Sequence, residues 1–181
     1  MKTIVTEIPD YKTFLRGEKT LEIGYPWLTF GAIMAIEKIL DDSKGQFEIL
    51  EFGSGGSTIF FQKRCKRLVS FEHDILWWTL VYNRLQNKIQ TSHNVYAFNY
   101  EISKSLQFLG IDKYDMVLVD GGANWKERQQ ILDAVPSSVK KGGWLIIDNY
   151  EHVKFDYAGW DVYTFDMLRY SGRGTRLCKK L

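Results

Sequence analysis

The segment Glu51-Phe52-Gly53-Ser54-Gly55-Gly56-Ser57-Thr58 decides the fold of this chain. It begins in the run 47–52, which we predict to be a buried β-strand, and leads into residues 58–65, which we predict to be a short helix. Glycines let the backbone turn sharply and approach a ligand closely, and the helix beyond them offers unpaired N–H groups. Alone, such a loop also fits a tight turn of any α/β protein, so other residues must show what it binds.

Short β-type runs alternate with helical patterns along the rest of the chain. We predict strands at 47–52, 67–72, 94–98, 115–120 and 144–148, and helices at 30–40, 58–65, 75–88 and 125–135. Strands separated by helices form right-handed βαβ units, which build a parallel sheet covered on both faces. The runs 162–166 and 175–180 leave no room for a helix between them, so we expect a hairpin there. The predicted fold is α/β: a Rossmann-like, seven-stranded, mostly parallel sheet with helices on both faces and a C-terminal antiparallel hairpin.

The composition is that of an ordinary folded domain. The 181 residues include 45% hydrophobic and 15% aromatic residues, which suffices for a continuous core. We assign residues 1–24 to an N-terminal arm or lid and residues 25–181 to a single domain. A formal net charge of +2 gives no strong reason to expect nucleic acid or a membrane as partner. The first residues lack the apolar region of a secretory signal, so we expect a cytoplasmic protein.

Cysteines and most aromatic residues are interpreted as packing residues. Cys65 and Cys178 are too few for a disulfide framework, and small buried thiols are more common than nucleophilic ones. Trp77 and Trp78 are expected to pack against the sheet. Three aromatic residues in irregular segments are candidates for the wall of an acceptor pocket, with packing as the alternative: Tyr25, Trp27 and Tyr157.

A carboxylate at the end of the second predicted strand narrows what the glycine-rich loop binds. Glu72 would lie beside the first strand, where a carboxylate accepts hydrogen bonds from both hydroxyls of a ribose. By itself, Glu72 also fits a surface acid at a strand end. Together, the loop and this carboxylate favour a cofactor that contains a nucleoside.

Four motifs follow one another along the chain: E-F-G-S-G-G-S-T at 51–58, S-F-E-H-D at 70–74, Y-D-M-V-L-V-D-G at 114–121 and G-G-W-L-I-I-D-N at 142–149. In this order they resemble class I S-adenosylmethionine (SAM)-dependent methyltransferases, over the chain from Tyr25 onward. The resemblance implies SAM as the cofactor. The residues implied to bind it are Glu51, Gly53, Ser54, Gly55, Gly56, Ser57, Thr58, Glu72, His73, Asn99, Tyr100 and Asp120. In that likeness the loop faces the methionine end, Glu72 the ribose, and His73, Asn99 and Tyr100 the adenine.

Within that class, three segments are similar to catechol-type, metal-dependent O-methyltransferases: 114–120, 125–128 and 140–149. The likeness implies a divalent cation, such as Mg²⁺ or Mn²⁺, bound by Asp120, Asp148 and Asn149. Three oxygen donors at the C-terminal edge of adjacent parallel strands also suit a hard cation. A simple turn at the strand end is the alternative for Asp148 and Asn149.

The implied reaction is O-methylation of a hydroxyl on a small molecule or a glycan, with no nucleic acid as acceptor. Candidate catalytic residues are Asp120, Asp148, His152 and Lys126. The stretch 121–124 looks inserted relative to the family and places Lys126 farther from Asp120 than the family's lysine, which favours a solvated helix residue. His152 is interpreted as a general base or a loop histidine.

Two other functions remain open at this point. One is a nicotinamide-dependent Rossmann oxidoreductase, which fits less well because Thr58 stands where the third fingerprint glycine belongs. The other is a binding module that keeps the SAM pocket without catalysis. The acidic pair Asp120 and Asp148 argues against the second, because a pure binding module does not need it.

Overall fold

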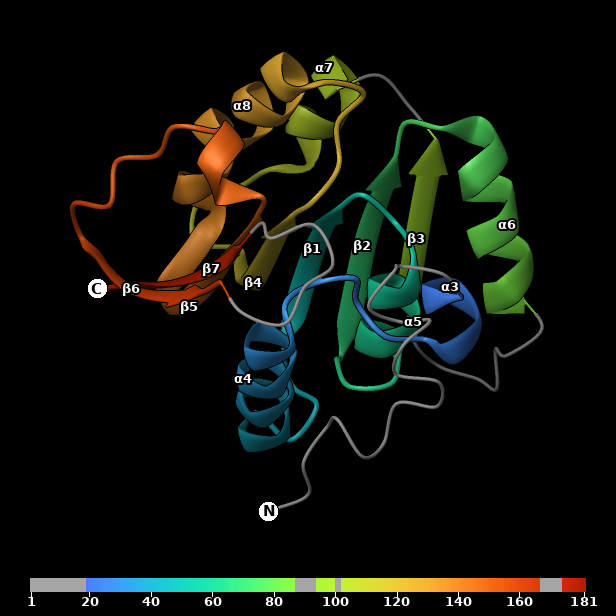
Figure 1. The fold of residues 1–181 in the computed structure, drawn as a ribbon, viewed down its shortest axis with the longest axis horizontal. Coiled ribbons are helices and arrows are strands. Elements are labelled where there is room, and N and C mark those ends of the chain that lie inside the picture. The colour runs from blue at the N-terminus through green and yellow to red at the C-terminus, as the bar shows by residue number, and fades with distance from the viewer. Residues whose placement is uncertain (1–18, 87–93, 100–101, 167–173) are drawn as a thin grey trace.

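The structure is a computed structural model that describes residues 19–86, 94–99, 102–166 and 174–181. A seven-stranded sheet with the order β3-β2-β1-β4-β5-β7-β6 runs through its middle (Figure 1). The strands are β1 (Glu48–Phe52), β2 (Arg67–Glu72), β3 (Asn94–Asn99), β4 (Tyr114–Val119), β5 (Val139–Asp148), β6 (Trp160–Phe165) and β7 (Thr175–Lys180). Strands β1 to β5 pair in parallel, and β7 is antiparallel to both of its neighbours. The predicted α/β class with a mostly parallel sheet and a closing antiparallel pair is confirmed.

Helices cover both faces of the sheet (Figure 1). They are α3 (Thr20–Ile23), α4 (Phe30–Asp42), α5 (Gly56–Gln62), α6 (Ile75–Gln86), α7 (Ile102–Ser105) and α8 (Trp125–Ala134), with 3₁₀ turns at Leu106–Phe108, Val135–Ser138 and Tyr150–His152. The strand order reverses between β1 and β4. In open parallel sheets, ligands bind at such a reversal, in the crevice beyond the carboxyl ends of the strands.

Alternating residues of the central strands form two separate cores. Ile49 and Met116 face α4 and α5 in one buried cluster, whereas Leu50 and Val117 face α8 in the other. A strand with both faces buried presents a continuous apolar run, as Met-Val-Leu-Val does in β4. The two cores hold the carboxyl ends of β1 and β4 in fixed positions.

Strand β5 begins at Val139, five residues before the predicted start at Trp144. Val139 pairs with Tyr114 and Trp144 pairs with Met116, so the register shifts between these two pairs. Gly142 has a φ of 76° within this irregular stretch, a conformation that glycine adopts without strain. The residues just before the predicted strand, Gly142 and Gly143, thus form a bulge inside a longer strand.

Most of the predicted arm, residues 1–24, lies outside the described residues. Its described part includes α3, which ends at Gly24 with a φ of 72°. A Cβ atom at Gly24 would lie 2.7 Å from the side chain of Ile59, so the turn after α3 packs tightly on α5.

Both cysteines are buried and unbridged, as predicted. Burial raises the pKa of the Cys65 thiol and of the Cys178 thiol to about 12. A thiol with such a pKa is protonated at neutral pH and is a poor nucleophile. Among the described residues, no helix is both long enough and apolar enough to span a membrane.

Candidate active site

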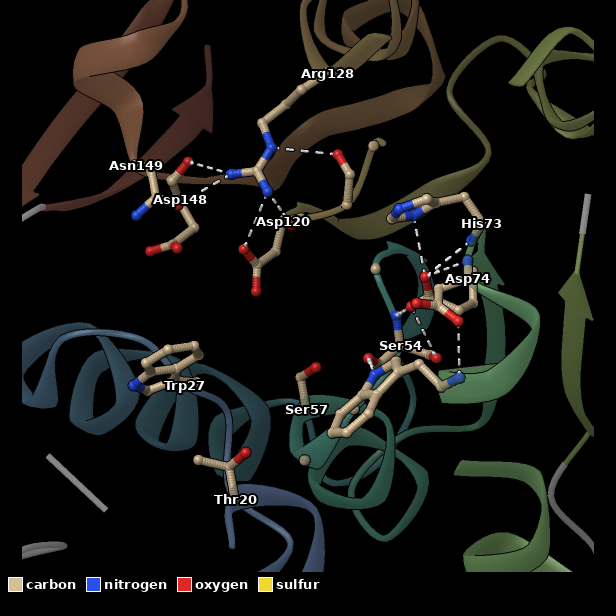
Figure 2. A pocket seen from close by; sticks show the side chains of 17 residues that line it. Thr20, Trp27, Ser54, Ser57, His73, Asp74, Asp120, Arg128, Asp148 and Asn149 are labelled. Atoms are coloured by element: carbon tan, nitrogen blue, oxygen red, sulfur yellow. Dashed lines mark hydrogen bonds and ion pairs between the residues drawn. The ribbon is translucent and has the colours of Figure 1, made fainter. Parts of the chain in front are cut away.

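A cavity of about 500 Å³ opens at the carboxyl ends of β1, β2, β4 and β5. Its volume lies within the range of small-molecule and cofactor sites. Most of its lining residues come from the segments that carry the four motifs: Thr20, Trp27, Gly53, Ser54, Gly55, Gly56, Ser57, Glu72, His73, Asp74, Trp77, Asp120, Gly121, Gly122, Arg128, Asp148 and Asn149. Figure 2 shows two groups of polar side chains, one around His73 and Asp74 and the other around Asp120 and Arg128.

The glycine-rich loop after β1 is shaped by close backbone contacts. Gly53 has a φ of 95°, and a Cβ atom there would lie 2.6 Å from the backbone nitrogen of Gly121. A Cβ atom at Gly56 would overlap the carbonyl oxygen of Tyr25. No other residue type fits these two positions without moving backbone atoms. The glycines therefore serve the close approach of three backbone segments as well as access for a ligand.

Glu51 is fully buried behind this loop and does not line the cavity. Its Oε2 accepts hydrogen bonds from Thr58 Oγ1 at 2.7 Å and from Ser70 Oγ at 2.6 Å. Thr58 Oγ1 in turn accepts a 2.8 Å bond from the backbone N–H of Gly55. The structure thus corrects the expectation that Glu51 and Thr58 contact the cofactor directly, because both fix the shape of the loop from behind.

Burial raises the pKa of Glu51 to about 7, and the negative charge of Glu72 adds to the increase. Hydrogen bonds from hydroxyl groups, those of Ser57, Ser70 and Thr58, oppose it. Removing a carboxylate from water disfavours its charged form, which is the larger effect here. Glu51 therefore exchanges its proton near neutral pH.

Glu72 ends β2 at the cavity wall with only 5% of its surface exposed. Its Oε2 accepts the backbone N–H of Ser54 at 2.9 Å and Ser54 Oγ at 3.2 Å. Its Oε1 accepts the backbone N–H groups of His73 and Asp74 at 2.9 and 3.0 Å, and His73 Nδ1 lies 3.0 Å away. The three backbone N–H groups fix the position of the carboxylate. The predicted ribose acceptor thus lies beside the loop, as expected.

Trp77 is a cavity residue that the sequence interpretation missed. Its indole Nε1 donates a 2.7 Å hydrogen bond to the carbonyl oxygen of Ser54, and its ring lies 3.7 Å from where a Cβ atom of Gly55 would be. Asp74 Oδ1 accepts the N–H groups of Leu76 and Trp77 and so caps the start of α6. This cap holds Trp77 over the glycine-rich loop.

The predicted adenine contacts are described only in part. Asn99 ends β3 in register with Glu72, which places its backbone at the same edge of the sheet. Tyr100 lies outside the described residues. Of the three aromatic candidates for an acceptor wall, only Trp27 lines the cavity. Tyr25 packs on Phe60 with ring centroids 5.5 Å apart, and Tyr157 Oη accepts a bond from Arg176.

The three predicted metal ligands meet at the other end of the cavity, after β4 and β5. The guanidinium group of Arg128 lies between them. It donates to the backbone carbonyl oxygens of Asp120 and Asp148 and to the side-chain oxygen Oδ1 of Asn149. Arg128 Nη2 also lies 3.6 Å from Asp120 Oδ1, as Figure 2 shows. The third ligand, the Asp148 carboxylate, is fully buried and accepts a 2.8 Å bond from Thr175 Oγ1.

This donor set does not fit a divalent cation. A metal ligand must turn a lone pair toward the ion at about 2.0 to 2.6 Å, but Asp120 and Asn149 already face a buried cationic group. The Asp148 carboxylate, in turn, is bonded to Thr175 Oγ1. The expected cation on Asp120, Asp148 and Asn149 therefore disagrees with the observed arrangement.

Lys126 and His152 lie outside the cavity and line a second hollow, between α8 and the segment after the last 3₁₀ turn. The His152 ring stacks on Trp125 with centroids 4.3 Å apart. Lys126 and Arg128 are two positions apart on α8 and therefore project from different sides of the helix. The structure corrects the expectation of catalytic roles for Lys126 and His152, because only Arg128 reaches the cavity from this helix.

No family model and no curated protein sequence matches this chain. Solved structures do match. The O-methyltransferase TomG from Streptomyces achromogenes, in complex with SAM, has 17% identity and a TM-score of 0.64, with 96% of this chain and 90% of that chain covered. An O-methyltransferase from Bacillus cereus, in complex with SAH, has 15% identity and a TM-score of 0.65 over 98% and 96%. An rRNA methylase from Streptococcus thermophilus has 10% identity and a TM-score of 0.63 over 82% and 96%.

These likenesses and the strand order establish the class I SAM-dependent methyltransferase fold that the four motifs indicated. Proteins with this fold named above act on different acceptors, so the fold alone does not identify the acceptor. The residues that line the cavity therefore have to indicate the acceptor.

Proposed function

We propose that this chain is a SAM-dependent methyltransferase that methylates a hydroxyl group of a small molecule or a glycan. One observation carries the proposal: the Glu72 carboxylate is held by three backbone N–H groups beside the glycine-rich loop and faces a cavity at the reversal of the strand order. A fixed carboxylate at this position suits the two hydroxyls of a ribose. The same place in the fold suits a nucleoside cofactor.

In this proposal, the cavity residues divide SAM among them. Glu72 would accept the ribose hydroxyls, His73 would lie toward the adenine, and the backbone of residues 53–57 would lie along the methionine part. When bound, SAM supplies a methyl group on a sulfonium sulfur, and its transfer to a hydroxyl forms a C–O bond, breaks the C–S bond and releases the hydroxyl proton. The chain must orient the hydroxyl and accept that proton.

Asp120 is the best candidate to accept the proton. Its side chain is 29% exposed, lines the cavity and points toward its middle (Figure 2). Asp148 is fully buried and bonded to Thr175, so it serves to join β5 to β7. We therefore assign the proton transfer to Asp120 and a structural role to Asp148.

Support for a hydroxyl acceptor comes from the polar end of the cavity and from the weak charge of the chain. Asp120, Asn149 and the ring of Trp27 suit a small molecule with both polar and apolar parts. The net charge of +2 supplies no field that would recruit an RNA backbone. We place the catalytic unit in residues 25–181, in keeping with the continuity of the sheet.

Calorimetry with S-adenosylhomocysteine and with NADH tests the cofactor. We expect one micromolar site per chain for S-adenosylhomocysteine and no response to NADH. Tight NADH binding without a response to S-adenosylhomocysteine would support the oxidoreductase alternative instead.

Turnover is tested by release of S-adenosylhomocysteine from SAM in the presence of hydroxylated metabolites and oligosaccharides. With an accepted substrate, Asp120→Asn should lower kcat at least about a hundredfold, because the variant lacks the general base. The variant should bind S-adenosylhomocysteine with an affinity within about threefold of the wild type. Lys126→Met is the matched control on the far side of α8 and should keep full activity. Cofactor binding without turnover for any acceptor would favour the inactive binding module.

A further inference from the structure

The guanidinium group of Arg128 stands where the sequence motifs predict a metal ion. Its Nε donates to the carbonyl oxygen of Gly121 at 3.2 Å. Its Nη1 donates to Asp148 O at 3.3 Å and to Asn149 Oδ1 at 3.2 Å, and its Nη2 faces the carbonyl and carboxylate oxygens of Asp120. All three nitrogens of one side chain therefore bind the ends of β4 and β5.

Arg128 is almost fully enclosed, with 8% of its surface exposed. The Trp125 ring packs against the guanidinium group, whose central carbon lies 4.9 Å from the centre of the ring. A guanidinium keeps its charge at any ordinary pH and has donors but no acceptor. The oxygens of this end of the cavity thus surround a permanent positive charge.

The loop before α8 places Arg128 in this position. Asn124 Oδ1 accepts the N–H of Glu127, and Glu127 Oε2 accepts the N–H of Ala123, both at 3.0 Å. This reciprocal pair fixes where the helix begins. Residues 121–124, which look inserted beside the catechol-type pattern, bring α8 to the point where its fourth residue reaches back to Asp120.

We infer that Arg128 takes the place of the divalent cation, so that this site excludes Mg²⁺ and transfers methyl groups without a metal. Arg128 is a positioning residue: it holds the Asp120 carboxylate and the Asn149 amide in the orientation in which they meet the acceptor. A metal ion at the same oxygens would have to displace a buried cation or lie beside it, and like charges in an enclosed site repel strongly. The catalytic part of this inference rests on the proposed function, whereas the exclusion of metal does not.

Binding of Mn²⁺ to the full chain, followed by electron paramagnetic resonance, tests the exclusion directly. We expect no stoichiometric binding to the wild-type protein up to about 1 mM Mn²⁺, the weak end of protein sites for divalent ions. Arg128→Ala frees the oxygens of Asp120 and Asn149 and should gain one site per chain. Arg128→Lys keeps a charge in the same place and should bind none, and Lys126→Ala is the matched control that removes a nearby charge outside the cavity.

The wild-type titration alone is able to overturn the inference. One Mn²⁺ bound per wild-type chain and lost in Asp120→Asn would show that the metal coexists with Arg128. Arg128→Ala that stays folded by circular dichroism and gains no Mn²⁺ would also contradict it, since the oxygens would then not form a metal site even when free. If Arg128→Ala does not fold, Arg128→Met provides a bulkier neutral side chain for the same comparison.

Turnover provides the second test. Its result distinguishes a failure of this inference from a failure of the proposed function. Calorimetry with S-adenosylhomocysteine first establishes that the cofactor binds. With an accepted substrate, activity should be the same in EDTA and in Mg²⁺, and Arg128→Lys should retain more of kcat than Arg128→Met. A tenfold or larger loss of activity in EDTA, restored by Mg²⁺, would contradict metal-free methyl transfer while leaving the methyltransferase proposal intact.

Discussion

The indole Nε1 of Trp77 donates a 2.7 Å hydrogen bond to the carbonyl oxygen of Ser54. A side chain from α6 thus holds the backbone of the glycine-rich loop between β1 and α5. Trp78, the next residue, is different: it stacks on Tyr82 with centroids 5.0 Å apart, and its own Nε1 has no hydrogen-bond partner among the described residues. Two adjacent tryptophans therefore form a natural matched pair for mutation.

Trp77→Phe should weaken binding of S-adenosylhomocysteine roughly fivefold, because it removes one hydrogen bond worth about 1 kcal/mol from the loop. Trp78→Phe is the control and should bind with unchanged affinity. Isothermal calorimetry measures both variants. Equal affinity for Trp77→Phe and the wild type would show that the loop keeps its shape without the indole.

Glu72→Ala should weaken cofactor binding on the order of tenfold to a hundredfold, since a charged acceptor of two hydroxyls is lost. The variant should also melt at a lower temperature, because three backbone N–H groups lose their partner. Glu48→Ala, at the opposite end of β1, removes a partly exposed carboxylate and serves as the control. A folded Glu72→Ala protein with wild-type affinity would refute the role of Glu72 as the ribose acceptor.

Gly53→Ala should destabilise the protein by about 3 kcal/mol, through strain at positive φ and overpacking together. The added Cβ atom would lie 2.6 Å from the backbone nitrogen of Gly121, and backbone atoms do not yield easily. Gly142→Ala shares a positive φ but has nothing within 4 Å of the added atom, so it should cost only about 1 kcal/mol. Urea unfolding compares the two variants, and equal losses would mean that the contact between the two loops is not tight in solution.

The buried carboxyl of Glu51 should make stability depend on pH. Its pKa is about 7 in the folded state and 4.5 ordinarily, so between these values the folded protein binds the proton more tightly than the unfolded chain. The free energy of unfolding should therefore fall as pH rises from about 4.5 to 7, by an amount on the order of 3 kcal/mol. Urea unfolding across this range measures the change.

Glu51→Gln carries no ionisable group and should lose that part of the pH dependence. Glu48→Gln removes a carboxyl from the same strand near the surface and provides the control. The decisive quantity is the difference between the wild type and each variant as a function of pH. Parallel curves for the wild type and Glu51→Gln would mean that folding does not change the pKa of Glu51.

The sequence predicted the sheet well because its central strands are apolar on both faces and its helices lie between them. The start of β5 was missed, since a glycine pair indicates a turn and a bulge equally well and only the pairing of Val139 with Tyr114 distinguishes them. The loop and Glu72 were placed correctly because both follow directly from strand ends. Two cavity residues were not predicted: Trp77, which bonds to the loop, and Arg128, which bonds to the ends of β4 and β5.

The reason for these two omissions is physical. Helix α6 exposes Ile75, Leu76 and Leu80 as well as burying Val81, so its apolar pattern does not mark which tryptophan faces the loop. Arg128 is charged and lies on a helix, a setting that usually means solvent. Its acceptors come from residues 120–121 and 148–149, which only the folded sheet brings to one place. Local pattern cannot reveal a side chain whose partners are all distant.

Two parts of the chain, residues 53–77 and residues 120–149, supply most of the cavity lining, and they touch tightly where Gly53 meets Gly121. Most residues of one part therefore do not contact the other, so the two parts are able to change largely independently during evolution. In the proposed function, substitutions beside Trp27 or Asn149 would alter the choice of acceptor while the glycine-rich loop keeps its shape. The pairing of β1 with β4 joins the two parts, and the contact between Gly53 and Gly121 leaves the least space there for a larger side chain in either part.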